Sequence, residues 1–195
     1  VLRRSTVWVD PEVQIWNRSL LENLRYGLDT GASGAVGPVL QQANLTDVLR
    51  SLPAGMQTQL GEGGGLVSGG EGQRVRLGRG LMHPAPRLVI LDEPFRGLDR
   101  PQRHELLTRA RQRWQETTLL CITHDLSAVL NFDRVAVMDG GRIVEEGSPG
   151  ELAGQPDTHF RRMLEQEERV RRSFWQGKEW RRLQLERGQL KAQNE

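Results

Sequence analysis

A short apolar run that ends in two carboxylates constrains this chain more than any other feature. Residues 88–91 are Leu, Val, Ile and Leu, and Asp92 and Glu93 follow them directly. Such a run is typical of a strand that is buried in a mainly parallel sheet. A carboxylate at the end of that strand can hold Mg²⁺ beside the phosphates of a nucleotide, and the next one can polarise an attacking water. The alternative is a strand that simply ends in polar residues.

Strands and helices alternate along most of the chain, which predicts an α/β domain with a mainly parallel sheet and flanking helices. Strands are expected over residues 5–9, 88–91 and 118–123, and a hairpin over residues 135–138 and 142–145. Helices are expected over residues 19–25, 39–49, 68–82 and 101–115. After about residue 155 the composition changes, and an amphipathic helical tail is expected over residues 156–195.

Composition excludes several classes of protein. The net charge of +2 does not favour a partner as highly charged as nucleic acid. The single cysteine, Cys121, rules out an internal disulfide framework and is expected to fill core volume. No apolar run approaches the ~20 residues that cross a bilayer. For the tail, packing on its own domain or on a partner's copy is one alternative, and a membrane surface contacted by Trp175 and Trp180 is another.

Two further segments carry groups that suit a phosphate ligand. Ser68, Gly69 and Gly70 precede an expected helix, so the backbone can approach an anion closely and the helix N-terminus faces it. The Ser68 hydroxyl adds a donor. His124 follows the expected strand at 118–123 and could donate to a γ-phosphate, although a lone histidine at this place is often a surface or capping residue.

Taken together with residues 97–99, these features resemble the ATP-binding cassette (ABC) ATPase family. The matching segments are VSGGE at 67–71 (signature motif), LVILDE at 88–93 (Walker B strand), GLD at 97–99 (D-loop) and His124 (switch histidine). TQLGEG at 58–63 is similar to the X-loop of the exporter branch. The resemblance covers about residues 2–151 and implies a P-loop NTPase-like fold, N-terminally truncated, with a C-terminal helical tail. It assigns residues 1–155 to a partial ABC ATPase domain and residues 156–195 to the tail.

The resemblance also implies roles for individual residues. Asp92 would bind Mg²⁺, Glu93 would act as the general base and His124 would sense the γ-phosphate. Residues of the signature motif and D-loop would contact the nucleotide of a partner domain, namely Ser68, Gly69, Gly70, Glu71 and Asp99. ATP and Mg²⁺ are the implied cofactors. The implied partners are a second ABC domain and a transmembrane domain at the cytoplasmic face of the plasma (inner) membrane, and not nucleic acid.

The chain departs from the family pattern in four ways. No G-x-x-x-x-G-K-[ST] loop occurs, and the only lysines are Lys178 and Lys191, so the Walker A loop is expected upstream of this sequence. Pro11 aligns where the Q-loop glutamine is expected, and it offers no amide to a metal. Glu71 replaces the glutamine of the signature. Glycines at 78 and 80 interrupt the expected helix and are interpreted as drift.

Three hypotheses follow from these observations. The first is an exporter-type ATPase domain that hydrolyses ATP in a dimer. The second is a degenerate, catalytically silent partner that lends its signature motif to another subunit. The third is a soluble ABC ATPase outside transport, which fits the SGGE sequence but not the X-loop-like segment. A sheet that lacks its first strands is also expected to expose an edge and part of its core, so the chain should aggregate when expressed alone.

Overall fold

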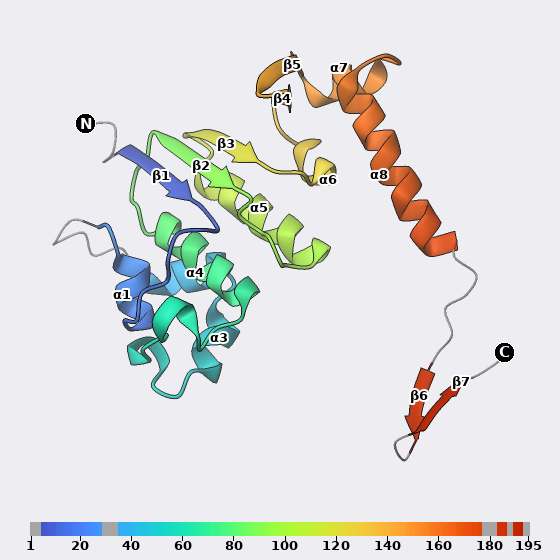
Figure 1. Cartoon of the computed structure of the whole chain (residues 1–195). Helices are drawn as coiled ribbons and strands as arrows, with labels where there is room; N and C mark the ends of the chain where they lie inside the picture. Colours follow the sequence, from blue (N-terminus) through green and yellow to red (C-terminus); the bar gives the residue numbers. More distant parts are fainter. Residues whose placement is uncertain (1–4, 29–34, 177–182, 187–188, 193–195) are drawn as a thin grey trace. The chain divides into compact units, whose positions relative to one another are not determined.

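The computed structural model describes residues 5–28, 35–176, 183–186 and 189–192. The chain divides into two compact units, and the boundary in the sequence lies between His124 and Asp125. The first unit is mixed α/β, with a parallel sheet and flanking helices as the sequence predicts (Figure 1). The second unit holds a hairpin and three helices, followed by a further pair of short strands.

The sheet of the first unit has three parallel strands in the order β1 (Thr6–Val9), β2 (Leu88–Asp92) and β3 (Thr118–Ile122). All three were expected, because each is a short run rich in β-branched and large apolar residues. The pairing register places Val9 beside Leu91 and Leu91 beside Cys121. The strands therefore reach the carboxyl edge of the sheet together.

One face of this sheet is covered and the other is open within the described part of the chain. Val7, Val9, Val89 and Leu91 are buried, and α4 and α5 lie on their side of the sheet (Figure 1). The opposite face carries a row formed by Trp8, Ile90 and Leu120, which are neighbours in the register. The Trp8 side chain is 60% exposed and that of Leu120 is 50% exposed. Parallel sheets are normally covered on both faces, so this row is an exposed piece of core.

Three of the described helices of the first unit begin at a residue whose side chain caps the helix. The helices are α1 (Leu20–Arg25), α2 (Val36–Gln42), α3 (Thr46–Ser51), α4 (Gly69–Leu81) and α5 (Arg100–Arg113). Short 3₁₀ turns lie at Gly55–Gln57 and Glu62–Gly64. Ser19 and Glu22 form a capping box at the start of α1, with the Glu22 amide donating to the Ser19 hydroxyl over 3.2 Å. Helix α4 begins with a second capping box, formed by Ser68 and Glu71, and α5 begins at Asp99, whose side chain accepts the amide of Gln102.

The single helix predicted over residues 39–49 is wrong, because two helices occupy this region. Helix α2 ends before Asn44, which adopts a left-handed backbone with φ of 54°. Asparagine tolerates this conformation better than most residues. The turn directs Leu45 into the core, where its side chain is fully buried. The apolar spacing across 39–49 thus comes from two short helices that face the same core.

The interpretation of the two helix glycines as drift is also wrong. A β-carbon at Gly78 would lie 2.7 Å from Cδ2 of Leu24 and 3.2 Å from Cδ1 of Leu45. A β-carbon at Gly80 would lie 3.0 Å from γ-carbons of both Val7 and Val9. Both positions bring α4 into close contact with α1 and β1. The helix-propensity cost of each glycine, up to ~1 kcal/mol, is offset by this packing.

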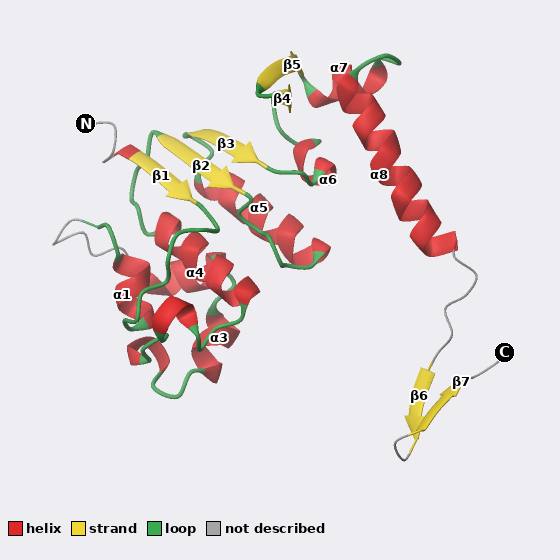
Figure 2. Cartoon of the chain, in the orientation of Figure 1, coloured by secondary structure: helices red, strands yellow, loops and turns green. Residues whose placement is uncertain are grey.

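The second unit packs around its own small core. Its elements are α6 (Leu126–Val129), β4 (Val135–Asp139), β5 (Arg142–Gly147), α7 (Pro149–Gly154) and α8 (His159–Gln176) (Figure 2). Strands β4 and β5 form the predicted hairpin, and both turn glycines, Gly140 and Gly141, have positive φ. The core consists of Leu126, Val137, Leu152 and Phe160.

Glu145 of β5 fixes the start of helix α8. Its two carboxylate oxygens accept hydrogen bonds from the amides of His159 (3.0 Å) and Phe160 (2.8 Å). These amides have no partner within the helix, and the negative charge suits the positive end of the helix dipole. Thr158 adds a further acceptor for the amide of Arg161, at 3.2 Å.

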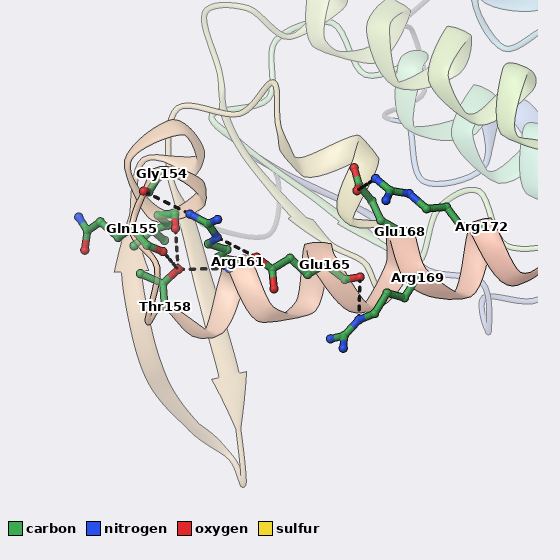
Figure 3. A network of polar contacts seen from close by, with 9 residues as sticks. Gly154, Gln155, Thr158, Arg161, Glu165, Glu168, Arg169 and Arg172 are labelled. Carbon is green, nitrogen blue, oxygen red and sulfur yellow. Dashed lines mark hydrogen bonds and ion pairs between the residues drawn. The ribbon is translucent and has the colours of Figure 1, made fainter.

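The predicted helical tail is correct only for its first part. Helix α8 ends at Gln176, and β6 (Leu183–Glu186) and β7 (Gln189–Ala192) then form an antiparallel pair. Along α8, pairs four residues apart form ion pairs, as between Arg161 and Glu165 (2.9 Å) and between Glu168 and Arg172 (3.0 Å) (Figure 3). Trp175 and Trp180, on which the membrane-surface alternative depends, lie outside the residues whose side chains are described.

None of the described helices combines the length and the apolar character that spanning a bilayer requires.

Candidate functional site

Three predicted site residues lie at the carboxyl ends of β2 and β3. Asp92 pairs with Ile122 in the register, and Glu93 and His124 follow these strands. The side chains of Glu93 and His124 meet, with Oε1 of Glu93 2.8 Å from Nδ1 of His124. The two residues are thirty-one positions apart in the sequence. Their contact arises because adjacent parallel strands end at one edge of the sheet.

The backbone of Glu93 leaves the sheet sharply. Its φ is 41°, in the left-handed region that non-glycine residues rarely adopt. Its amide still donates to the carbonyl of Ile122 over 2.9 Å, so the turn begins only after the last pairing contact. A strained residue held by its neighbours often marks a functional site. Here the strain turns the carboxylate from the strand direction towards His124.

The chemistry of the pair depends on how open each side chain is. The Glu93 side chain is 29% exposed and that of His124 is 76% exposed. Glu93 is thus held in a half-buried place, while the imidazole stands in solvent where a ligand can reach its second nitrogen. The contact uses only Oε1 of Glu93, so the second carboxylate oxygen can still accept a hydrogen bond or a proton from a water.

The donors at this edge suit Mg²⁺ bound together with a phosphate ligand. Among residues 5–28, 35–176 and the two short tail strands, no three His, Cys, Asp or Glu side chains gather closely enough to hold a metal ion alone. Mg²⁺ usually takes one or two carboxylates and fills its other positions with water and phosphate oxygens. Asp92 fits the carboxylate part of such a set.

Pro11 lies in a turn and brings no metal donor. Strand β1 ends at Val9, beside Leu91, so Asp10 follows at the same edge as Asp92. The carboxylate of Asp10 accepts the amide of Glu12 over 2.8 Å, which closes the turn around Pro11. Gln14, the nearest glutamine, uses its backbone carbonyl to accept hydrogen bonds from Arg79 at 3.4 and 3.5 Å.

The Ser68–Glu71 segment forms the exposed N-terminus of α4. The hydroxyl of Ser68 accepts the amide of Glu71 at 3.4 Å, and the carboxylate of Glu71 accepts the amide of Ser68 at 2.8 Å. The other oxygen of that carboxylate lies 3.9 Å from a guanidinium nitrogen of Arg74. Glu71 therefore directs its charge at its own helix and at an arginine. Gly69 has open space around it, so a ligand can approach the backbone there.

The structure also brings the Ser68–Glu71 segment against residues 97–99. A β-carbon at Gly70 would lie 2.7 Å from Cδ2 of Leu98 and 3.6 Å from the carbonyl oxygen of Gly97. The next residue, Asp99, accepts the amide of Gln102 at 2.8 Å and so caps α5. The predicted residues thus form two groups, Asp92 with Glu93 and His124 at the strand ends, and Ser68, Gly69, Gly70 and Glu71 with Asp99 at two helix N-termini.

Sequence reasoning missed Asn23, which organises the loop before α1. Its side chain is fully buried. The amide oxygen accepts the backbone N–H of Trp16 (2.9 Å), and the amide nitrogen donates to the carbonyls of Trp16, Arg18 and Ser19. Its only signal in the sequence is a polar residue within LLENLR where the apolar spacing would place a core side chain.

No family model matches this chain, but comparison with known proteins finds relatives. The glutathione/L-cysteine transport system ATP-binding/permease protein CydC of Escherichia coli is 35% identical over 158 residues, which are 80% of this chain and 27% of CydC. The ATP-dependent lipid A-core flippase of Acinetobacter baylyi is 36% identical over 160 residues, which are 82% of this chain and 28% of the flippase. The chain therefore spans about a quarter of the length of these relatives.

A solved structure agrees with these relatives. A bacterial Atm1-family ABC exporter with ATP bound superposes with a TM-score of 0.79 at 29% identity, over 85% of this chain and 29% of that one. The fold is that of a nucleotide-binding domain of an ABC exporter, and the homologues are ABC exporter ATP-binding/permease proteins. The resemblance read from the four sequence motifs is confirmed at this level.

Proposed function

We propose that this chain is the ATP-binding and ATP-hydrolysing part of an ABC exporter-type transporter, which works as a dimer and powers export across a membrane. The observation that carries the proposal is the 2.8 Å contact between Glu93 and His124 at the ends of two neighbouring parallel strands. A base and a hydrogen-bond donor at this edge are the groups that hydrolysis of a phosphoanhydride requires. ATP-binding and ATP-dependent activities in the names of the relatives support it.

In this proposal the residues at the strand ends serve the chain's own nucleotide. Bound Mg²⁺ would neutralise developing charge on the phosphates, and Asp92 would be its protein ligand. Glu93 would orient and deprotonate the attacking water through the carboxylate oxygen that does not contact His124. The exposed imidazole of His124 would then donate to a phosphate oxygen.

The residues at the two helix N-termini would serve a partner domain. Ser68, Gly69 and Gly70 would contact the nucleotide of the partner, because the N-terminus of α4 is exposed and Gly69 is open to approach. Glu71 would sit beside that nucleotide with its charge offset by Arg74. Asp99 would touch the partner across the same surface.

We further propose that the phosphate-gripping loop lies outside these 195 residues, in the same polypeptide. No lysine-bearing glycine loop occurs in the sequence. The row of Trp8, Ile90 and Leu120 leaves one face of the sheet open, so a further segment of the polypeptide could cover it. The relatives are between three and four times as long as the matched segment. A transmembrane domain would belong to the same assembly, with this domain at the cytoplasmic face of the plasma (inner) membrane.

A second candidate function is a catalytically silent partner that lends Ser68 to another subunit. The turn around Pro11 favours it, because Asp10 uses its carboxylate to accept the amide of Glu12 and Pro11, at the place expected for the Q-loop glutamine, has no side-chain amide. In this version Glu93 and His124 would keep their contact but would not act on a nucleotide.

One experiment separates the two candidates. Dimers are prepared from the full-length protein and its native partner subunit, and only this chain carries Glu93→Gln, Ser68→Arg or the control Glu116→Gln at an exposed glutamate. If the chain hydrolyses ATP, Glu93→Gln removes the turnover of its own site and Ser68→Arg removes that of the opposite site. If the chain is silent, only Ser68→Arg lowers ATPase activity. If neither substitution changes the rate relative to Glu116→Gln, both candidates are wrong.

A further inference from the structure

Ile15 fits into a socket formed by two glycines that are distant in the sequence. Its side chain is 2% exposed. A β-carbon at Gly72, in the first turns of α4, would lie 3.0 Å from Cδ1 of Ile15. A β-carbon at Gly64 would lie 3.2 Å from the same methyl group. The terminal methyl of Ile15 therefore fills space that exists only because both of these residues lack a side chain.

Two arginines of α4 hold the backbone on the N-terminal side of Ile15. Nε of Arg76 donates to the carbonyl of Val13 over 2.6 Å. Arg79 donates to the carbonyl of Gln14, and its Nε donates to the carbonyl of Asn23 over 3.0 Å. Both guanidinium groups are partly withdrawn from water, and this burial lowers their pKa.

The loop that is held in this way joins two parts of the candidate site. It begins at Asp10, beside Asp92 at the carboxyl edge of the sheet, and it reaches α1 at Ser19. Midway, Ile15 touches the residue four positions after Ser68, and the amide of Gly72 donates to the carbonyl of Ser68 over 2.8 Å. A displacement of the loop is thus passed through Ile15 to the turn of α4 that presents Ser68.

We propose that Ile15 is a positioning residue for the N-terminus of α4, which it locks to residues 10–18 through the socket of Gly64 and Gly72. The lock couples the strand ends, where the chain's own nucleotide is proposed to bind, to the Ser68 turn that is proposed to meet the partner's nucleotide. This second part rests on the proposed function. The lock itself does not, because it depends only on packing.

The test uses hydrogen exchange by mass spectrometry on the full-length protein without nucleotide. Ile15→Val removes the Cδ1 methyl and little else. Leu106→Val is the matched control, because Leu106 is an equally buried aliphatic residue in α5. We expect Ile15→Val to speed exchange in peptides covering residues 10–18 and 66–73 by roughly twofold to tenfold, the factor that one buried methyl group commonly represents. Leu106→Val should speed exchange in α5 and leave residues 66–73 unchanged.

A second variant makes the test specific for the socket. Gly72→Ala places a methyl group only 3.0 Å from Cδ1 of Ile15, so alone it should displace Ile15 and speed exchange at residues 10–18. Combined with Ile15→Val, the added methyl replaces the missing one, and exchange at residues 10–18 and 66–73 should return towards the wild-type rate. Strictly additive effects of the two substitutions would overturn the proposal. So would a change confined to residues 10–18 in Ile15→Val.

ATPase measurements on the same variants then address the coupling to function. In Ile15→Val, we expect the KM for ATP to rise by a larger factor than kcat falls. In the double variant with Gly72→Ala, we expect the KM to return towards the wild-type value. An unchanged KM alongside altered exchange would overturn the functional coupling while leaving the lock in place. A protein with no ATPase activity in any form, wild type included, would remove the proposed function without affecting the exchange result.

Discussion

Oε1 of Glu93 and Nδ1 of His124 lie 2.8 Å apart, although the residues come from the ends of different strands. The parallel register of β2 and β3 and the left-handed backbone of Glu93 together create this contact. Either residue alone would be an ordinary polar residue after a strand. Their contact makes the edge of the sheet a place where a proton can be held and moved.

The first prediction concerns this pair. In the full-length protein, Glu93→Gln keeps the size of the side chain but removes the base, so steady-state ATPase activity should fall about 100-fold or more. His124→Ala should also lower turnover, because no donor then faces the phosphate. Malachite-green assays of phosphate release would measure both rates. A Glu93→Gln protein that turns over at the wild-type rate would contradict the role of Glu93.

The second prediction concerns the close contact at Gly78. Gly78→Ala raises intrinsic helix propensity, yet its β-carbon would press on Leu24, so we expect the free energy of unfolding to fall by about 1–3 kcal/mol. Gly150→Ala is the control, because a β-carbon at Gly150 meets nothing within 4 Å. Urea denaturation followed by tryptophan fluorescence would compare the two. Equal stability of both variants would mean that the α4–α1 packing is looser than described.

The third prediction concerns pH. Burial lowers the pKa of His83, so the unfolded chain binds this proton more readily than the folded chain does. The free energy of unfolding should therefore fall as the pH drops from about 6.5, the ordinary histidine value, to the lowered pKa. His83→Gln should remove this part of the pH dependence. Denaturant midpoints at about pH 7.5 and about pH 5.5 would reveal it as a smaller difference for the variant than for the wild type.

The fourth prediction concerns the start of α8. Glu145→Ala removes the acceptor for two free helix amides, so the free energy of unfolding of the second unit should fall by about 1–2 kcal/mol. Its neighbour provides the control, because Glu146 forms only an exposed ion pair with Arg134 and Glu146→Ala should cost less than about 1 kcal/mol. Amide exchange across residues 159–164 should quicken in the first variant alone.

The parts of the fold that the sequence predicts well are those controlled by local patterns. The apolar run at β2 and the helices expected over residues 19–25 and 68–82 each depend on residues a few positions apart. The break at Asn44 could not be predicted in this way. Its left-handed turn is favoured because it buries Leu45, and that burial depends on the packing of several helices. Strands β6 and β7 also lie where a helix was predicted.

For the candidate site too, residues placed by local sequence patterns could be predicted, and residues placed by distant packing contacts could not. Asp92, Glu93 and His124 were predictable, because consecutive parallel strands place their carboxyl ends together. The roles of Ile15 and Asn23 were not. Ile15 is one aliphatic residue in a polar loop, and only the contacts to Gly64 and Gly72 reveal what it fills. Glycines that look like breaks in a helix pattern can therefore be the best sign of a partner side chain elsewhere in the chain.

The open face of the sheet determines how stability measurements on this chain should be read. Trp8 and Leu120 expose apolar surface that a cover would remove from water, at roughly 25 cal/mol for each Å² buried. Any segment or subunit that covers them adds its contribution to the same cooperative unit. A melting temperature measured on the 195 residues alone is thus a lower bound on the value that these residues reach when the face is covered.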